Sequence, residues 1–297
     1  MEKALAIDIG GTKIYNAIID KNGNIISEIE KAHTPKTFAE IKSTLEDIVK
    51  RHENEVDLVA FCTCGAVNNQ NTRIVGSTGN IAKEYPTMPF QSISTKPVYV
   101  ENDANCAAWA EYKIGASKNT SVSVMITLGT GVGGGIIIND MLLKGKNGAA
   151  GEMHFKMSTK KERKCTCGAW DCFECYASGN GLKKTAEEML NNPDVTTYDV
   201  VDGVKANDSK MVEILDKWQK DIAEGLIGLA DIFDPDCIVL SGSMAEFTDT
   251  KKIEDYVNSQ IVTTPTKVKL AEAGNFSGMI GAALLGFDKF DGGEDNK

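Results

Sequence analysis

The chain has 297 residues, of which 42% are hydrophobic and 25% charged, a composition that excludes general disorder and fits a folded globular protein. A formal net charge of -10 argues against a surface built to neutralise nucleic-acid phosphates, so we expect no nucleic-acid partner. The sequence shows no signal peptide and no apolar run of transmembrane length. We therefore expect a cytoplasmic protein without a membrane partner, whose eight cysteines are thiols or metal ligands.

The first 30 residues predict three antiparallel strands, at residues 4–9, 13–20 and 25–30. The turn GGT separates the first two, and Lys21-Asn22-Gly23-Asn24 is a hairpin signal before the third. Apolar spacing then predicts further elements: a helix at 37–51, strands at 58–64 and 98–100, and a helix at 104–114.

The opening pattern occurs a second time, as SVSVMITL, the turn GTGVGGG, IIIND and MLLKG. This duplication predicts two related α/β lobes that face a shared cleft. Helices at 181–191 and 211–233 and a strand at 237–240 complete the second lobe. We assign residues 1–118 to a smaller N-terminal lobe and residues 119–297 to a larger lobe. Whether the C-terminal tail joins the smaller lobe is left open by the sequence.

Each copy carries a glycine-rich turn directly after a strand, DIGGTK at 8–13 and LGTGVGGG at 128–135. Glycine lets backbone N–H groups approach an anion closely, and Thr12 adds a hydroxyl donor. A plain tight turn is the alternative for either motif alone. Two such turns at equivalent points of a duplicated fold favour a clamp that holds a polyphosphate, and neither turn fits the P-loop or Rossmann pattern.

A third motif, ENDAN at 101–105, lies between a predicted strand and a predicted helix. Asp103 is either the N-cap of that helix or the general base that takes a proton from an attacking hydroxyl. Position alone leaves these alternatives open.

The pentapeptide CTCGA occurs twice, at 62–66 and at 165–169. The second copy, together with His154 and Cys172, supplies three thiolates and one imidazole, which predicts a closed zinc site formed by His154, Cys165, Cys167 and Cys172. The first copy ends a strand, so we expect Cys62 and Cys64 to point to one face as apolar core side chains.

These motifs resemble those of the ROK family (repressor, open reading frame, kinase), over essentially the whole chain. The matching stretches also include GAAGEMH at 148–154, CTCGAWDCFE at 165–174 and DPDCIVLSGS at 234–243. The resemblance implies an actin-like ATPase fold of two ribonuclease-H-like lobes around a cleft, with a zinc-bound loop in the larger lobe. It also implies ATP-dependent phosphorylation of a hexose by a homodimer built through the larger lobe.

The resemblance assigns roles to individual residues. Asp103 corresponds to the catalytic base. Positions for phosphate, magnesium and adenosine fall on Asp8, Gly10, Gly11, Thr12, Thr130, Gly131 and Gly242. Sugar contacts fall on Gly79, Asn80, Asn102, Asp103, Glu152, His154 and Glu174. The implied cofactors are ATP, Mg²⁺ and a structural Zn²⁺, and His154 would hold zinc with one ring nitrogen and a sugar hydroxyl with the other.

The chain departs from the family pattern at Met153, Asp171 and Ser243, where glycine is usual. A positive φ would strain Met153, whereas Asp171 would tolerate it better. The stretches AAWAEY at 107–112 and ASGNGL at 177–182 look most like N-acetylmannosamine kinases, which favours phosphorylation of the 6-hydroxyl of that sugar in sialic acid and amino sugar catabolism. Glucose or another hexose, and GTP in place of ATP, remain open. A sugar-responsive regulator is the competing class, but we expect no DNA-binding segment because the first strand begins by Ala4.

Overall fold

The computed structural model describes residues 1–76, 79 and 81–291. The chain divides into two compact units, each assembled from separate stretches of sequence. The first comprises Met1–Lys118, Gly135–Gly151 and Glu272–Lys297, and the second comprises Asn119–Gly134 and Glu152–Ala271. The sequence-based division at residue 118 coincides with the first of these boundaries, whereas residues 135–151 and the C-terminal segment cluster with the first unit.

The first unit is built on a five-stranded sheet in the order β3-β2-β1-β4-β5. Strand β2 runs antiparallel to both of its neighbours, β1 and β3, whereas β1, β4 and β5 are parallel. The strands are β1 (Lys3–Ile9), β2 (Lys13–Asp20), β3 (Glu30–His33), β4 (Leu58–Thr63) and β5 (Val98–Asn102). The helices of this unit are α1 (Phe38–His52), α2 (Asp103–Ile114) and α8 (Ser277–Asp291).

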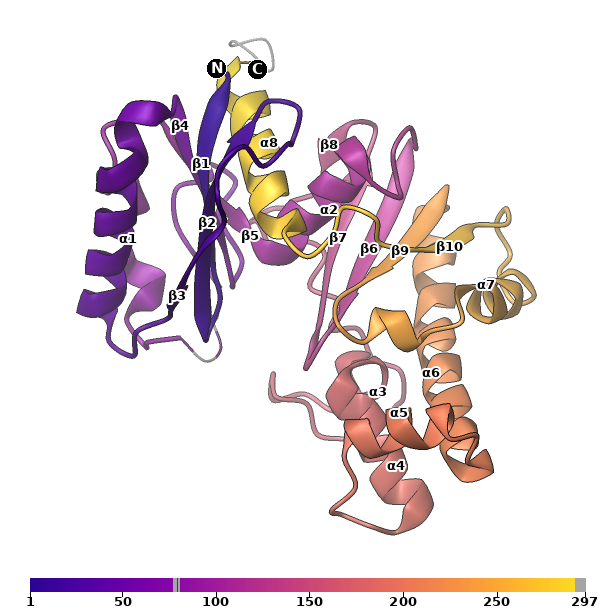
Figure 1. Cartoon of the computed structure of the whole chain (residues 1–297). Helices are drawn as coiled ribbons and strands as arrows, with labels where there is room; N and C mark the ends of the chain where they lie inside the picture. Colours follow the sequence, from indigo (N-terminus) through magenta and orange to yellow (C-terminus); the bar gives the residue numbers. More distant parts are fainter. Residues whose placement is uncertain (77–78, 80, 292–297) are drawn as a thin grey trace. The chain divides into compact units, whose positions relative to one another are not determined.

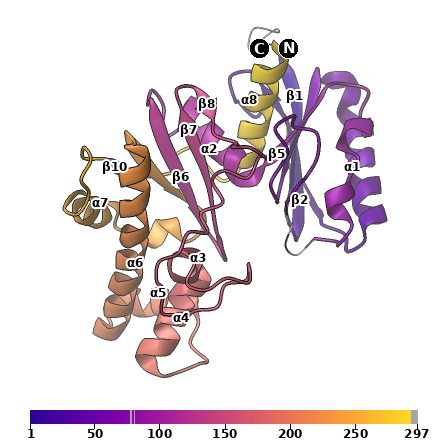
Figure 2. The ribbon, with the colours of Figure 1, turned by 180° about the vertical axis from the view of Figure 1, so that it is seen from behind.

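Helices cover both faces of this sheet, with α1 on one face and α2 and α8 on the other (Figures 1 and 2). Alternate strand residues point to opposite faces, so the sheet contributes side chains to two apolar clusters, one on each face. Phe61 and Leu45 belong to the cluster under α1. Cys62, Trp109 and Met279 belong to the cluster under α2 and α8. The ends of β1 and β5, which carry the candidate site residues, are thereby held in a rigid three-layer frame.

The second sheet has the order β10-β9-β6-β7-β8. Its strands are β6 (Val122–Leu128), β7 (Val132–Ile138), β8 (Met141–Leu142), β9 (Cys237–Ser241) and β10 (Lys267–Leu270). The helices of the second unit are α3 (Glu174–Ala177), α4 (Gly179–Leu190), α5 (Thr197–Lys205), α6 (Ser209–Phe233) and α7 (Thr250–Asn258). Helix α6 packs against each of the other four. Among the described residues no helix is long and apolar enough to cross a bilayer.

The two sheets share one topology, which confirms the predicted duplication. Counted from the first strand of each copy, both orders read third, second, first, fourth, fifth. In both copies the fourth strand is parallel to the first and to the fifth. The turn Asn139-Asp140 has positive φ at both residues, as a two-residue hairpin of type I′ requires.

Two local predictions were wrong. The third strand lies at Glu30–His33, not at 25–30, because the Oγ of Ser27 accepts the Ile18 N–H at 2.8 Å and interrupts the ladder, leaving one bridge between Ile19 and Ile25. Cys62 and Cys64 also lie on opposite sides of the sheet. Cys62 joins the cluster under α2 and α8, whereas Cys64 follows the end of β4 and packs against the cluster under α1.

Candidate active site

The first glycine turn connects β1 to β2 and is closed by a hydrogen bond from the Gly10 N–H to the Lys13 carbonyl (2.9 Å). Thr34, just after β3, braces the turn from the side. Its hydroxyl donates to the Gly10 carbonyl (2.6 Å) and its N–H donates to the Thr12 carbonyl (3.1 Å). The turn is thus held in one conformation by three hydrogen bonds, with Gly11 and Thr12 accessible at its tip.

Asp8 ends β1 beside this turn. Burial, followed by the charge of Asp103, raises the pKa of Asp8 from 3.8 to about 6, and a hydrogen bond with the Cys62 thiol acts in the opposite direction. The two carboxylates therefore belong to one electrostatic site within the first unit. Such a pair is a suitable place for a cation, since Mg²⁺ is commonly held by one or two carboxylates together with substrate phosphates.

The structure shows that Asp103 is not the N-cap of α2, although its Oδ1 also accepts the Ala104 N–H at 2.8 Å. The N-cap of α2 is Asn102, whose side-chain oxygen accepts the N–H groups of Ala104 (3.0 Å) and Asn105 (3.1 Å). Asp103 is the first residue of the helix and is exposed. The cap function that competed with a chemical function for Asp103 thus belongs to its neighbour. The amide of Asn102, a predicted sugar contact, also donates to the Gly65 carbonyl at 3.3 Å.

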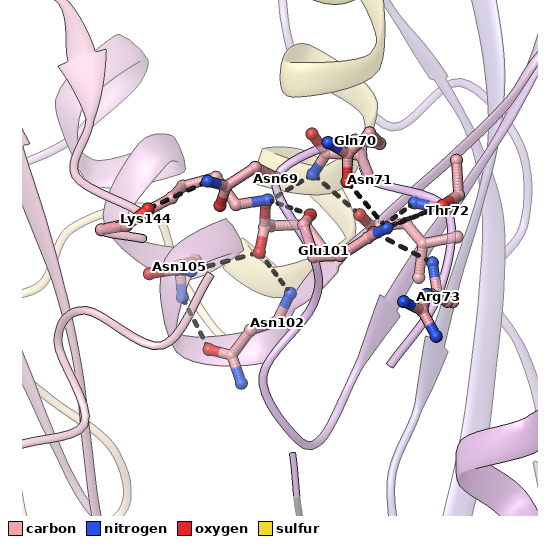
Figure 3. A network of polar contacts seen from close by, with 12 residues as sticks. Asn69, Gln70, Asn71, Thr72, Arg73, Glu101, Asn102, Asn105 and Lys144 are labelled. Carbon is pink, nitrogen blue, oxygen red and sulfur yellow. Dashed lines mark hydrogen bonds and ion pairs between the residues drawn. The ribbon is translucent and has the colours of Figure 1, made fainter. Parts of the chain in front are cut away.

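An ion pair between Lys144 and the buried carboxylate of Glu101 holds this motif in place (Figure 3). The Oε2 of Glu101 receives the Lys144 ammonium at 2.6 Å and the Asn71 amide at 2.7 Å. Its Oε1 receives the Asn105 amide at 3.1 Å and the Asn102 N–H at 2.9 Å. The Glu101 side chain is 0% exposed. One carboxylate therefore joins the end of β5, the start of α2 and two loops of the first unit.

One predicted sugar contact, Gly79, lies in the loop after β4. Gly79 has φ +62, and an added Cβ would meet no atom within 4 Å, so the restriction there is on backbone conformation alone. Asn80 lies outside the described residues.

The second glycine turn connects β6 to β7 in the second unit. The Gly129 N–H donates to the Gly131 carbonyl (3.0 Å), as Gly10 does in the first turn. The start of α4 packs onto this turn, with the Gly179 N–H on the Gly129 carbonyl (2.8 Å) and the Asn180 amide on the Thr130 carbonyl (2.8 Å). Thr130 is exposed.

Gly242 follows β9 and lies against the end of β6. Its φ of +87 is a left-handed value, and an added Cβ would lie 2.4 Å from the Leu128 carbonyl oxygen. No other residue fits both conditions. The next position, Ser243, is not among the residues with positive φ, so serine replaces the usual glycine there without backbone strain.

The predicted metal ligands of the second unit converge. The ligand atoms of His154, Cys165, Cys167 and Cys172 all lie within 4.8 Å of one another. The sulfurs of Cys167 and Cys172 are 3.6 Å apart, and a hydrogen bond with His154 lowers the pKa of Cys167 to about 6. Three soft sulfurs and one imidazole at this spacing fit a tetrahedral Zn²⁺ ion.

The two copies of CTCGA differ in their surroundings but share one backbone feature. Gly65 and Gly168 both have positive φ, +85 and +91. In the second copy the turn closes through the Cys165 N–H on the Ala169 carbonyl (2.9 Å), which aims two thiols at one point. The first copy has no such partner set among the described residues: Cys62 is buried beside Asp8 and Cys106.

His154 is brought to the cysteines by the segment that contains it. The Phe173 N–H donates to the Phe155 carbonyl (2.9 Å), and the two rings stack with centroids 4.9 Å apart. Met153 has φ +32 and is buried, so the expected strain is present and burial of its side chain opposes it. Glu152 is exposed.

Asp171 is the second position at which the chain lacks the glycine usual in the family. It has φ +57, and its side chain supports the loop. Its buried carboxylate accepts the N–H groups of Lys161 (2.7 Å), Glu162 (3.0 Å) and Arg163 (2.7 Å), and the Tyr176 hydroxyl (3.0 Å). The Arg163 N–H is the largest of the influences that lower the pKa of Asp171. A glycine would give the loop no such anchor.

Glu174 links the cysteine loop to the second glycine turn. Its Oε2 accepts the Val132 N–H at 3.1 Å, whereas its Oε1 accepts the Thr166 hydroxyl at 3.0 Å and lies 3.7 Å from the Cys165 sulfur. The carboxylate predicted to bind sugar thus also connects the candidate zinc and phosphate elements of this unit.

Sequence reasoning missed Lys144 and Cys175. Lys144 pairs with Glu101, which lies 43 residues earlier in the chain. The only sequence signal for this pair was a lysine in the loop at the end of the second copy of the opening pattern. Cys175 is one of eight free thiols, and its position three residues after Cys172 was an available signal.

Known proteins are similar to this chain over nearly its whole length. A model of the ROK family matches residues 4–289. A glucokinase of Streptomyces coelicolor is 32% identical over 313 aligned residues, covering 96% of this chain and 98% of that enzyme. An N-acetylmannosamine kinase of Yersinia pseudotuberculosis is also 32% identical, over 292 residues, with the same two coverages.

The crystal structure of a ROK family glucokinase from Streptomyces griseus, in complex with glucose and AMPPNP, is 28% identical and has a TM-score of 0.77. The match covers 95% of this chain and 98% of that one. Together with the match to the family model, it confirms the predicted actin-like ATPase fold.

Proposed function

Because the chain belongs to the ROK family, we propose that it is an ATP-dependent sugar kinase that phosphorylates the 6-hydroxyl of N-acetylmannosamine. The observation that carries the phosphotransferase assignment is the pair of braced glycine turns at equivalent ends of two sheets of equal topology. In the first unit that turn stands beside the Asp8 and Asp103 carboxylates. Positioned backbone donors and a metal-binding carboxylate are what transfer of a γ-phosphoryl group requires.

In the proposed reaction Asp103 accepts the proton of the sugar 6-hydroxyl, whose oxygen attacks the γ-phosphorus of ATP as the bond to ADP breaks. Asn102 caps α2 and the Glu101 network fixes the strand end, so Asp103 starts from a rigid position. Asp8 would hold Mg²⁺, which neutralises developing phosphate charge when bound. Gly10, Gly11, Thr12, Thr130 and Gly131 would contact the phosphates, and Gly242 would lie beside adenosine.

The sugar would be held by Asn102, Glu152, His154 and Glu174, with Gly79 and Asn80 as further contacts. Zn²⁺ on His154, Cys165, Cys167 and Cys172 is proposed as structural. When bound there, Zn²⁺ would hold one ring nitrogen of His154 and thereby set the direction in which the other nitrogen points. The metal then supplies orientation, not Lewis-acid chemistry.

One feature, the two stretches AAWAEY and ASGNGL, supports N-acetylmannosamine, with glucose as the alternative. The curated relatives include kinases of both sugars at equal identity. The stretches AAWAEY and ASGNGL favour the amino sugar. Their side chains act here in packing, as shown by the Trp109 N–H on Asp288 (3.0 Å) and by Ser178, which caps α4.

The test is an ADP-release assay with a panel of hexoses and N-acetylhexosamines, with ATP and GTP compared as donors. The proposal expects the highest kcat/KM with N-acetylmannosamine and ATP. A glucose kcat/KM that exceeds the N-acetylmannosamine value reverses the substrate assignment and leaves the kinase assignment intact. Absence of ADP release with every sugar overturns both.

We also propose that the protein is cytoplasmic and forms a homodimer through the larger lobe, as the resemblance to the ROK family implies. Light scattering with and without a strong chelator tests whether the dimer depends on metal at the proposed zinc site. Loss of kinase activity with the dimer retained would support a zinc function at the sugar. A monomeric mass in both conditions contradicts the proposed dimer.

A further inference from the structure

The candidate zinc site has a fifth possible donor, Cys175, in the first turn after Cys172. The Cys175 N–H donates to the Cys172 carbonyl at 2.8 Å, so the two residues lie on one tight turn. The Cys175 thiol is half-buried and makes a hydrogen bond with Cys165, one of the four converging ligands. Its sulfur lies outside the set of four converging ligand atoms, so Cys175 has to move to bind the metal.

The four sulfurs form a local unit. They lie between residues 165 and 175, in a loop closed by the Cys165 N–H on the Ala169 carbonyl and by a bridge between Lys164 and Trp170. The spacing Cys172-x₂-Cys175 is common for paired zinc ligands, and sites with four cysteines are as well established as sites with three cysteines and one histidine. The loop therefore contains four sulfurs: those of Cys165, Cys167 and Cys172 converge with His154, and the fourth, Cys175, contacts Cys165.

His154, in contrast, comes from a separate segment whose conformation costs free energy. The preceding residue, Met153, has φ +32, a value that side chains other than glycine rarely adopt. The imidazole reaches the site from outside the loop that holds the cysteines, so its release leaves the backbone contacts that close that loop unchanged. His154 is therefore the ligand that is exchanged most easily.

We propose that Cys175 is an alternative zinc ligand that replaces His154, so that the site exists in a histidine-bound and a four-sulfur form. The exchange breaks the Zn–N bond to His154 and forms a Zn–S bond to Cys175, and the thiol proton passes to the released imidazole or to water. This inference rests on the proposed zinc site. It gives the sugar-contacting imidazole of the proposed kinase a second, metal-free state.

The test uses Co²⁺ in place of Zn²⁺ in the full-length protein, because sulfur-to-cobalt charge-transfer intensity reports the number of bound thiolates. The variants are His154→Ala, Cys175→Ser and the double variant, with Cys64→Ser as the control for loss of a thiol elsewhere. We expect His154→Ala to bind one Co²⁺ per chain, with charge-transfer intensity raised in the proportion four to three. Cys64→Ser should retain the wild-type spectrum, whereas Cys175→Ser should lose the charge-transfer intensity that the four-sulfur form contributes to it.

The double variant should return to three thiolates and bind Co²⁺ at least about tenfold more weakly than His154→Ala, since loss of a ligand exceeds the 10- to 100-fold effect typical of its hydrogen-bond partners. Alkylation provides a second readout: Cys175 should react in the metal-bound wild type and be protected in metal-bound His154→Ala. His154→Asn replaces His154→Ala if the latter fails to fold.

The outcomes distinguish the two levels of proposal. Failure of the wild type to bind Co²⁺ overturns the zinc site itself. A wild type that binds, together with a His154 variant that shows three thiolates regardless of residue 175, overturns the role of Cys175 and leaves the zinc site standing.

Discussion

The ammonium of Lys144 lies 2.6 Å from the Oε2 of Glu101, a carboxylate whose side chain is wholly buried. The pair connects two loops of the first unit with the strand end that leads to Asp103. Removal of one partner from a buried pair leaves an uncompensated charge, which costs more than the pair contributes to stability. The cost of substituting one residue of the pair should therefore depend on whether the other is still present, and a double-mutant cycle can measure this dependence.

Lys144→Met should lower the free energy of unfolding by about 2 to 4 kcal/mol, because Glu101 keeps its amide donors but loses its counter-charge. Glu101→Gln combined with Lys144→Met should cost less than the sum of the single substitutions. Urea unfolding of the four proteins gives the coupling energy. Additive effects would show that the ion pair contributes no coupling.

Asp171→Gly should destabilise the cysteine loop by about 2 kcal/mol. The substitution relieves a positive φ but leaves three N–H groups, one of them the buried N–H of Arg163, without their acceptor, and the second effect is larger. Asp171→Asn is the matched control, since it keeps the conformation and one acceptor oxygen. Thermal unfolding of the metal-loaded proteins should rank wild type above Asn and Asn above Gly. Glycine equal to wild type would contradict the proposed support.

Local patterns were sufficient for much of the fold and part of the site. Strand alternation and glycine placement located both turns, and the spacing of His154 and three cysteines identified a cluster that converges in space. These signals act over a few residues, or through ligand chemistry that tolerates few alternatives. The duplicated order of motifs was likewise visible, because each copy repeats its own strand and turn pattern.

Other features depended on choices that local sequence leaves open. Asn102 and Asp103 are both good N-caps, so only the backbone angles of the folded helix decide between them. A side-chain oxygen at Ser27 displaced β3 by several residues. Helix α8 was not predicted, since nearly all of its first eleven residues are buried and show no polar stripe. The Lys144–Glu101 pair depends on tertiary contact alone.

Asp103→Asn should reduce kcat by at least about 10²- to 10⁴-fold, the range typical of losing a general base, and should leave sugar affinity largely intact. Asp47→Asn, an exposed substitution on α1, is the control for loss of a carboxylate elsewhere. Steady-state kinetics give kcat, and calorimetry gives sugar affinity. A kcat equal to that of the wild type would remove Asp103 from the proposed role.

Asp8→Asn should stabilise the protein at neutral pH while it abolishes phosphoryl transfer. The folded-state pKa of Asp8 is about 6, above its ordinary value of 3.8, so folding favours the protonated form. Its contribution to stability is fully present below pH about 4 and is lost as the pH rises through about 6. Relative to wild type, the variant should therefore gain on the order of 2 kcal/mol at pH 7.5 and little at pH 4. Urea unfolding of magnesium-free protein at the two pH values checks this, and equal differences at both would contradict it.

Cys62→Ala should raise the pKa of Asp8 further, by up to roughly one unit, because the Cys62 thiol makes a hydrogen bond that favours the ionised carboxylate. Cys62→Ser should restore most of the wild-type value, since a hydroxyl also donates. Cys64→Ala is the matched control: it removes a nearby thiol that is not among the groups acting on Asp8, at a similar stability cost of about 1 to 2 kcal/mol. The pKa can be followed in magnesium-free protein by carboxyl-carbon NMR with labelled aspartate, and the signal that disappears in Asp8→Asn assigns it. If Cys62→Ala titrates at the wild-type pH, the thiol contributes packing alone and the first copy of the pentapeptide has no electrostatic role.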